Sequence, residues 1–356
     1  MSIVAKEILI YRLGSLGDTV MALPCFHKVR EYFPDATITL LTNRPVAAKA
    51  APIEAILGST NFFDRVLDYP TGTRNPLVLA KLIKQIRAHN IDTVINLAAI
   101  RSKISVKRDR WFFRAAGIKQ QIGFISSEND YELNSILEGN DLEWEANRLV
   151  RRLYELGPID LSADRSWDLK LTTAELEEAK RVLSNLTSTS SIIAISLGTK
   201  LQVSNWEIDN WLNLLSQLKV TLFGWKLVVI GASEEASLAD LCLRAWDQQG
   251  VNLCGKTSPR VSAAVLKQAS IFVGHDSGPM HLAACVGVPC VAIFSARVLP
   301  RRWYPRGNSN HILYHRTDCA GCGLDVCIEQ KKKCILSIKV DEVHQAIMQT
   351  LNYLKN

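Results

Sequence analysis

The sequence lacks any apolar run of the length that a membrane span needs. A transmembrane helix takes about 20 consecutive apolar residues, and no stretch of the 356 residues approaches that length. The first residues, MSIVAKEILIYRLG, carry a lysine and a glutamate where a signal peptide has its apolar core, and no small-residue cleavage site follows. We therefore expect a globular protein of the cytoplasm.

Two recognition signatures are also missing. The glycines after the first predicted strand, Gly14 and Gly17, have the spacing G-x-x-G-D, which departs from the G-x-G-x-x-G dinucleotide fingerprint. The net charge of +7 suggests acidic partners, but no nucleic-acid recognition module is found. NAD binding and nucleic-acid binding are therefore not supported.

The alternation of short apolar stretches with helical stretches predicts the fold class. It is typical of α/β proteins with doubly wound, mostly parallel sheets, and the length suits two such domains. Strands are predicted at residues 7–12, 36–41, 64–68, 91–97 and 121–124, and then at 192–196, 226–230, 251–254, 271–273 and 290–294. We expect two Rossmann-like domains that face each other across a cleft.

The domain boundary is placed by a change of composition at residues 157–175. Gly157-Pro158 ends a helix, and Thr172 with Glu175 forms a capping box that begins the next one. The N-terminal domain is thus expected over 1–165 and the C-terminal domain over 171–338. The last segment, 339–356, forms a helix with no obvious place in the second sheet, and we expect it to cross back to the N-terminal domain.

The stretch HDSGPMHLAACVGVP at 275–289 predicts a strand, a tight turn and a helix. Pro279 suits the first helical position, and Asp276 or Ser277 can cap the free amides before it. These amides and the helix dipole favour an anion such as a phosphate or diphosphate. An ordinary strand-to-helix turn is the alternative interpretation.

Asp18 has two interpretations in the first βα unit. Aspartate is a good N-cap, so it can simply begin the helix that follows. It can also present a carboxylate at the carboxyl edge of the first strand, where open α/β sheets hold their ligands.

Basic residues gather in one segment and alternate there with Trp111, Phe112 and Phe113. A solvated helix face is one interpretation, and a surface for a membrane or an anionic glycolipid is the other. The basic residues are Arg101, Lys103, Lys107, Arg108, Arg110 and Arg114.

The nine cysteines divide into two groups. Five lie in apolar strands and helices, where cysteine behaves as a small buried hydrophobe. The other four have the spacing C-x2-C-x4-C-x6-C, which in a cytosolic chain favours a metal over disulfides. A structural zinc is one interpretation, and reduced thiols or a redox-dependent link are the others. These four are Cys319, Cys322, Cys327 and Cys334.

Four motifs in order along the chain, RLGSLGDTVMALP, GKTS at 255–258, HDSGPMHLA and the cysteine-rich loop, together resemble glycosyltransferase family 9, the lipopolysaccharide heptosyltransferases. The resemblance implies a GT-B fold, with the acceptor on the N-terminal domain and an ADP-sugar on the C-terminal domain. It implies inverting transfer of L-glycero-D-manno-heptose to the inner core of lipopolysaccharide. It also implies that the reaction requires no cofactor, and that the protein associates peripherally with the cytoplasmic face of the inner membrane.

The resemblance also assigns residues. Asp18 matches the family's general base. Glu235 matches its ribose-binding glutamate, and Glu234 is the neighbouring alternative. The turn in the 275–289 stretch matches its diphosphate site. There, Asp276 orients the turn, and His281 either donates to the diphosphate or is held within the fold. The full set of candidate site residues is Thr199, Lys200, Glu235, Asp276, Ser277, Gly278, Met280 and His281 on the donor side and Gly14, Gly17, Arg101 and Lys103 on the acceptor side.

One departure from the family pattern concerns the donor. The family carries a lysine two residues before a Trp-Pro pair, and this chain has Ser204, Trp206 and Glu207 at those positions. Lys200 can supply the missing charge and Thr199 a hydroxyl. The departure keeps two alternatives open, namely a transferase or epimerase for another nucleotide sugar and a non-catalytic nucleotide-sugar-binding relative.

Overall fold

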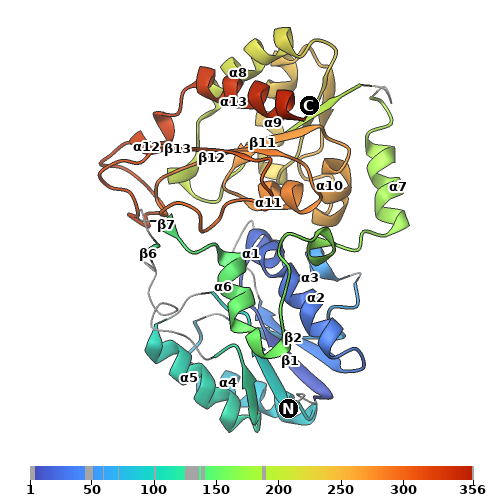
Figure 1. Cartoon of the computed structure of the whole chain (residues 1–356), viewed down its shortest axis with the longest axis vertical. Coiled ribbons are helices and arrows are strands. Elements are labelled where there is room, and N and C mark those ends of the chain that lie inside the picture. Colours follow the sequence, from blue (N-terminus) through green and yellow to red (C-terminus); the bar gives the residue numbers. More distant parts are fainter. Residues whose placement is uncertain are drawn as a thin grey trace. The chain divides into compact units, whose positions relative to one another are not determined.

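The computed structural model describes residues 5–44, 51–58, 60–70, 72–99, 102–124, 136–137, 141–186 and 190–354. The chain divides into two compact units, Met1–Trp167 and Asp168–Asn356. Within the described residues, no helix combines the length and the apolar character needed to cross a bilayer. Each unit is built on one parallel sheet with helices on both faces (Figure 1).

The first unit has a five-stranded sheet in the order β3-β2-β1-β4-β5. Alternate residues of β1 face opposite helical layers, and Leu9 and Tyr11 pack in one core with residues of α4 and α5. The strands are β1 (Glu7–Tyr11), β2 (Thr37–Asn43), β3 (Arg65–Tyr69), β4 (Thr93–Asn96) and β5 (Gln120–Ile122). The helices are α1 (Leu16–Met21), α2 (Leu23–Tyr32), α3 (Glu54–Leu57), α4 (Pro76–Ala88), α5 (Lys103–Ala115) and α6 (Glu145–Arg152), with η3 (Tyr154–Leu156), η4 (Asp164–Trp167) and the short pair β6 (Ile136–Leu137) and β7 (Asp141–Leu142).

The second unit has a six-stranded parallel sheet in the order β10-β9-β8-β11-β12-β13. Its strands are β8 (Ile192–Ser196), β9 (Lys226–Val229), β10 (Gly250–Asn252), β11 (Ile271–His275), β12 (Cys290–Phe294) and β13 (His311–Tyr314). Its helices are α7 (Thr173–Val182), α8 (Ile208–Thr221), α9 (Ala236–Ala245), α10 (Pro259–Leu266), α11 (Gly278–Cys285), α12 (Lys333–Leu336) and α13 (Val340–Tyr353), with η5 (Gln202–Ser204) and η6 (Ser233–Glu235).

The C-terminal helix α13 belongs to the second unit, so the expectation that it has no place in the second sheet is wrong. It packs against α8 and against strands β11, β12 and β13. Val343, Ala346, Ile347 and Leu351 are buried in the second core. Their spacing of three and four residues places them on one face of the helix, and this face covers the sheet of the helix's own unit.

The predicted linker is only partly a connection between the units. Thr172 is the N-cap of α7 and forms the predicted capping box with Glu175, which confirms that prediction. The residues before it pack within the first unit, because Trp167 is buried and stacks on Trp144 with ring centroids 5.6 Å apart. The first unit therefore extends to Trp167.

Each sheet has one place where the strand order reverses. In the first sheet, β1 and β4 are neighbours with Tyr11 opposite Asn96, and in the second, β8 and β11 are neighbours with Ser196 opposite Gly274. Consecutive connections leave such a point in opposite directions, so a crevice opens beyond the carboxyl ends of the two strands. Ligand sites are therefore expected after Tyr11 and Asn96, and after Ser196 and His275.

Candidate functional site

Asp18 lies just beyond β1, at the reversal point of the first sheet. Helix α1 begins at Leu16 with Ser15 as its N-cap, so Asp18 is the third helical residue and not the N-cap. Its Oδ2 atom accepts the backbone N–H and the hydroxyl of Ser15, both at 2.9 Å. Gly17, an acceptor-side candidate from the sequence, consequently lies inside helix α1 as its second residue.

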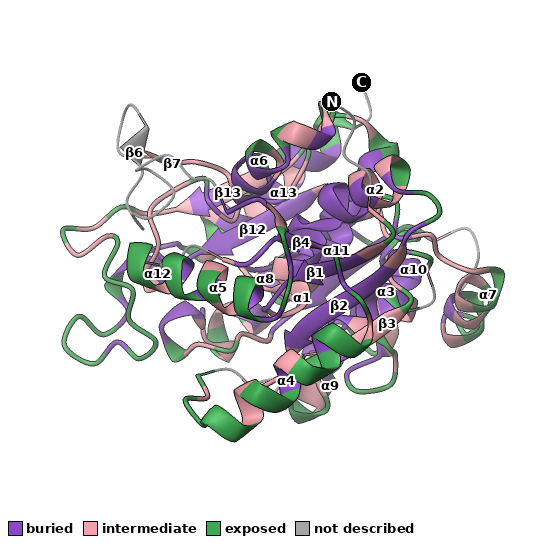
Figure 2. Cartoon of the chain, turned by 90° about the horizontal axis from the view of Figure 1, so that it is seen from below, coloured by how far each residue is buried: buried purple, intermediate pink, exposed green. Residues whose placement is uncertain are grey.

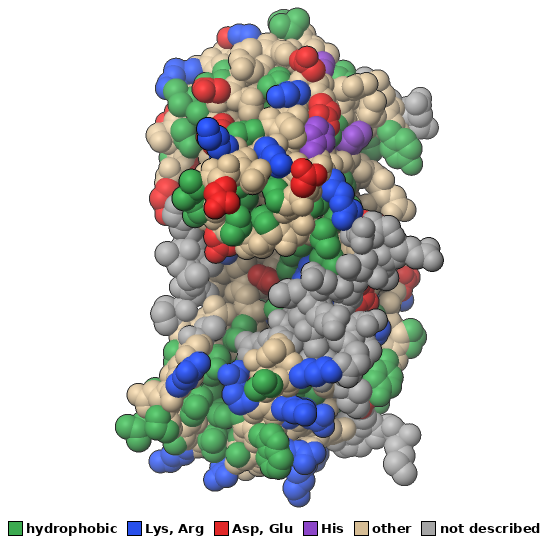
Figure 3. Space-filling model, turned by 90° about the vertical axis from the view of Figure 1, so that its left-hand side faces the viewer, with side chains coloured by type: hydrophobic (Ala, Val, Ile, Leu, Met, Phe, Trp, Pro, Cys, Tyr) green, Lys and Arg blue, Asp and Glu red, His purple; other side chains and the backbone are tan. Residues whose placement is uncertain are grey.

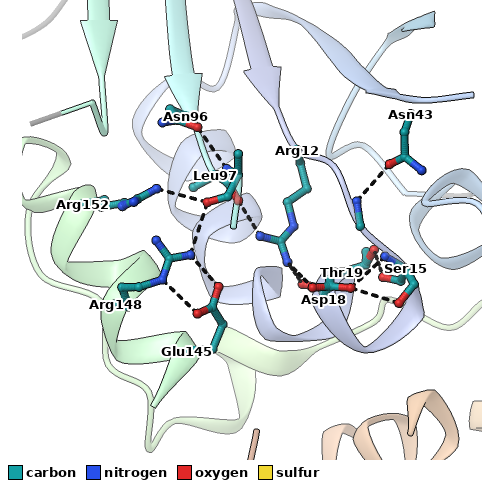
Figure 4. Close-up of polar contacts among 12 residues, drawn as sticks. Arg12, Ser15, Asp18, Thr19, Asn43, Asn96, Leu97, Glu145, Arg148 and Arg152 are labelled. Carbon is teal, nitrogen blue, oxygen red and sulfur yellow. Dashed lines mark hydrogen bonds and ion pairs between the residues drawn. The ribbon is translucent and has the colours of Figure 1, made fainter. Parts of the chain in front are cut away.

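Arg12 contacts Asp18 through its guanidinium group (Figure 4). The guanidinium is fully buried, it lies 3.7 Å from Asp18 Oδ1, and it donates to the backbone carbonyls of Asp18 and Leu97. Burial lowers the pKa of Arg12, and the nearby Asp18 carboxylate opposes that shift. The Asp18 side chain remains a quarter exposed, so a carboxylate held from two sides keeps an accessible edge.

Gly14 allows this close arrangement. Its φ of +149° lies in a region that residues with a side chain rarely adopt, and a Cβ atom there would lie 2.6 Å from Asp18 Cβ. Its N–H donates to Asn43 Oδ1 at 2.9 Å. Of the other acceptor-side residues, Lys103 is the exposed first residue of α5, and Arg101 lies outside the described residues.

A buried charged cluster that sequence reasoning missed surrounds the end of β4 (Figure 4). Glu145 and Arg148 of α6 form a pair with Nε and Oε2 2.8 Å apart, and both side chains are almost fully buried. Arg148 and Arg152 both donate to the carbonyl of Ala98, at 3.2 and 3.1 Å. The available signal was an acid and a base three residues apart on the core face of a helix.

The turn after β11 has the form that the sequence predicts. Ser277 is the N-cap of α11, and the helix begins at Gly278, so Pro279 is its second residue rather than its first. The Ser277 hydroxyl has no hydrogen-bond partner within the described part of the chain. The hydroxyl oxygen itself is buried, whereas the first-turn amides of α11, which have no partner within the helix, suit an anion.

His281 and Met280 differ in what they can contact. His281 is 4% exposed, and its Nε2 lies 3.9 Å from Asp276 Oδ1. Asp276 therefore sits beside the ring as well as in the turn. Met280 is fully buried, so its side chain is part of the core, and only its backbone remains for the donor-binding role that the resemblance implies.

Glu235, not Glu234, faces the end of β8. A Cβ atom on Gly198 would lie 1.9 Å from Glu235 Oε1, and one on Gly231 would lie 2.0 Å from Oε2. The carboxylate thus occupies space that two glycines leave open, and it accepts the N–H of Ala232 at 3.1 Å. Glu234 is exposed and bonds with Ser233 Oγ. The position of Glu235 at the carboxyl ends of β8 and β9 suits a ribose.

His275 ties the loop after β8 to β11. Its Nε2 accepts the N–H of Trp206 at 3.1 Å, and its ring packs edge-on against Trp211. Burial lowers the pKa of His275 to about 4, which keeps the imidazole neutral and able to accept. The same loop carries Thr199, whose hydroxyl bonds within the loop, and the exposed Lys200.

A second lysine, which the sequence pattern did not point to, reaches the same loop. Ser204, at the position of the missing family lysine, is buried and bonded to Ser295 Oγ at 2.9 Å. Lys332 Nζ donates to Asn205 O at 3.1 Å and pairs with Glu207, and burial lowers its pKa. Glu207 has a φ of +70°, so a proline, which fixes φ near −65°, does not fit there.

The C-terminal cysteines do not gather into a metal site. Cys327 and Cys334 are buried, Cys319 is half-buried, and Cys322 is exposed. Among the residues that the structure describes, no three Cys, His, Asp or Glu side chains are placed to hold a metal ion. Structural zinc needs four ligands around one point, so this arrangement does not fit it.

Two doubly wound α/β units, each with one reversal of strand order in its parallel sheet, have the architecture of the GT-B class of glycosyltransferases. The chain belongs to glycosyltransferase family 9 (heptosyltransferase), whose family model matches residues 79–333. It is thus a glycosyltransferase.

Three known proteins illustrate this similarity. Lipopolysaccharide heptosyltransferase 3 of Escherichia coli K12 is 24% identical over 81% of this chain and 82% of its own. Lipooligosaccharide heptosyltransferase 2 of Campylobacter jejuni is 24% identical over 98% and 99%. The solved structure of E. coli ADP-heptose lipopolysaccharide heptosyltransferase II superposes with a TM-score of 0.66 at 16% identity, over 98% of this chain and all of that one.

Proposed function

We propose that the protein transfers a heptose from ADP-heptose to an acceptor of the lipopolysaccharide core, with inversion at the anomeric carbon. The names of the relatives and the ADP-heptose specificity in the name of the solved neighbour support the donor and acceptor classes. The observation that carries the proposal is the free N-terminus of α11 at the same sheet edge as the Glu235 carboxylate. The N-terminus of α11 suits a diphosphate, and the Glu235 carboxylate suits a ribose.

The reaction forms one bond and breaks another. The acceptor hydroxyl attacks the anomeric carbon, the bond from that carbon to the diphosphate oxygen breaks, and ADP leaves. Asp18 takes the hydroxyl proton. The charge that develops on the diphosphate is stabilised by the amides and dipole of α11, with Ser277 and Lys200 as side-chain donors. No metal is needed for this step, because these groups supply the compensating positive charge.

Asp18→Asn tests the base. The amide cannot take a proton, so turnover should fall by about 10²–10⁴, while ADP affinity measured by calorimetry stays within about twofold. Asp35→Asn, at an exposed aspartate after α2, is the matched control and should keep full activity. Full turnover by Asp18→Asn would remove this residue from the mechanism.

The same assay separates the alternatives. We expect ADP to be released from ADP-heptose in the presence of a core acceptor. We expect no nucleotide release from other nucleotide sugars. An epimerase would convert its donor without releasing nucleotide, and a non-catalytic relative would bind ADP without turnover. A glycolipid acceptor also implies that the protein works at the cytoplasmic face of the inner membrane, as a peripheral membrane protein.

A further inference from the structure

The positive charge of the chain is concentrated in one segment. Residues 71–120 contain eleven Lys and Arg against two acidic residues, a net charge of +9, which exceeds the +7 of the whole chain. One of these two acids is paired with an arginine of the segment. Asp109 is buried and bonded to Arg108, and Asp92 accepts the backbone N–H of Lys6 at the opposite edge of the sheet.

Helices α4 and α5 carry this charge together with exposed apolar side chains. Leu77 is 78% exposed, Ile104 80% and Trp111 71%. Exposed lysines follow at helical spacing on the same outer surfaces, namely Lys81, Lys84 and Lys107. We call these six residues the α4–α5 face.

The two helices form one layer. Their inner residues Leu82 and Ile86 of α4 and Val106 and Phe113 of α5 share a single core, and Arg87 at the end of α4 donates to Ala115 O at the end of α5 at 2.6 Å. Both helices turn exposed surface outward (Figure 2). In Figure 3 the visible surface of the first unit, at the bottom, shows Lys, Arg and hydrophobic side chains close together.

We propose that the α4–α5 face docks on an anionic lipid bilayer. Lysine ammonium groups attract the negative headgroups, and each contributes modestly near the surface. Leu77, Ile104 and Trp111 insert at the boundary between headgroups and acyl chains, where tryptophan is favoured. Nucleic acid fits less well, because exposed leucine and isoleucine gain nothing from a phosphate backbone. This inference rests on the peripheral association proposed above and names the surface responsible.

Flotation of the full-length protein with vesicles tests the proposal. Wild-type protein should float with phosphatidylglycerol-containing vesicles, less so as salt rises, and not with pure phosphatidylcholine. Lys81→Gln/Lys84→Gln/Lys107→Gln should weaken vesicle binding about 100-fold, at about fivefold per charge. Ile104→Ser/Trp111→Ser should weaken it about tenfold or more. Phe223→Ser, at a residue of the second unit that is 92% exposed, is the matched control and should bind as wild type.

Several outcomes would overturn the proposal. They are no flotation of wild type, equal flotation with phosphatidylcholine, unchanged binding in both multiple variants, or tighter binding to a duplex oligonucleotide than to vesicles. Circular dichroism checks that each variant is folded. Release of ADP with a deacylated, water-soluble acceptor should be unchanged in Ile104→Ser/Trp111→Ser. Failure of that turnover in wild type contradicts the proposed function, whereas the flotation result stands on its own.

Discussion

At the scale of single residues, the proposed donor site depends on space as much as on charge. Glu235 reaches the end of β8 only because Gly198 and Gly231 have no side chains. The carboxylate is further held by the N–H of Ala232. A residue type with no reactive side chain thus decides where the Glu235 carboxylate lies.

Gly198→Ala should therefore act through Glu235. The added methyl would lie 1.9 Å from Oε1 and must displace the carboxylate. A lost hydrogen bond to a charged group contributes about 1.5–3 kcal/mol, so ADP should bind about 10- to 100-fold more weakly by calorimetry. Glu235→Ala should have the same effect, and the double variant should be no worse than either one. Additive losses would show that Gly198 acts independently of Glu235.

His275 should make the free energy of unfolding depend on pH. Burial lowers its pKa to about 4 from an ordinary 6.5, so the unfolded chain binds the proton more readily than the folded one. The stability that neutral His275 contributes is complete above pH 6.5 and is lost as the pH falls towards 4. Between pH 7 and pH 5 the free energy of unfolding should drop by about 2 kcal/mol from this group.

The test compares wild type with His275→Gln in urea titrations at both pH values. The variant should be less stable at pH 7, because the amide replaces a well-placed acceptor for Trp206 N–H. It should also show a smaller loss between pH 7 and pH 5. Equal losses in the two proteins would mean that His275 does not carry the pH dependence.

At the scale of elements, what the sequence predicted well is what depends on local pattern. The strands at 192–196 and 290–294 match β8 and β12, because they are short apolar runs that end at turns. The capping box at Thr172 and the turn at 276–278 were predicted by the same local chemistry. The edge strand β13 was missed, because its partly buried residues give a weaker apolar signal.

What the sequence could not predict depends on contacts between distant residues. Arg12 and Leu97 are 85 positions apart, and Lys332 and Asn205 are 127 apart. No local period reports such pairs. The same reason explains the error over α13, whose apolar face was visible in the sequence but whose partner was not.

Lys332→Met should loosen the loop that ends at Glu207. The change keeps the side-chain length and removes the ammonium that binds Asn205 O and Glu207. Because Glu207 is half exposed and can be solvated, we expect a loss of only about 1 kcal/mol in the free energy of unfolding. Amides of residues 203–207 should exchange faster with solvent. Lys333→Met, at an exposed neighbour, is the control, and equal effects of the two changes would contradict the assignment.

At the scale of the whole molecule, one design is used twice. Each unit has a parallel sheet, and each places its candidate site at the point where strand order reverses, with Asp18 after β1 and the 276–281 turn after β11. Each also has its own core, one including Ile86 and the other Ile347. Because the two cores are separate, a nucleotide that binds to one unit should stabilise that unit alone.

Urea unfolding should therefore resolve two transitions, of which only one responds to nucleotide. ADP at 100 times its Kd stabilises the unit that binds it by about 2.7 kcal/mol. Ile347→Ala, on the buried face of α13, should lower the ADP-sensitive transition by about 2–5 kcal/mol, and Ile86→Ala, on the buried face of α4, should lower the other by a similar amount. A shift of both transitions by Ile347→Ala, or an ADP effect on the transition that Ile86→Ala lowers, would show that the nucleotide does not bind through the second unit alone.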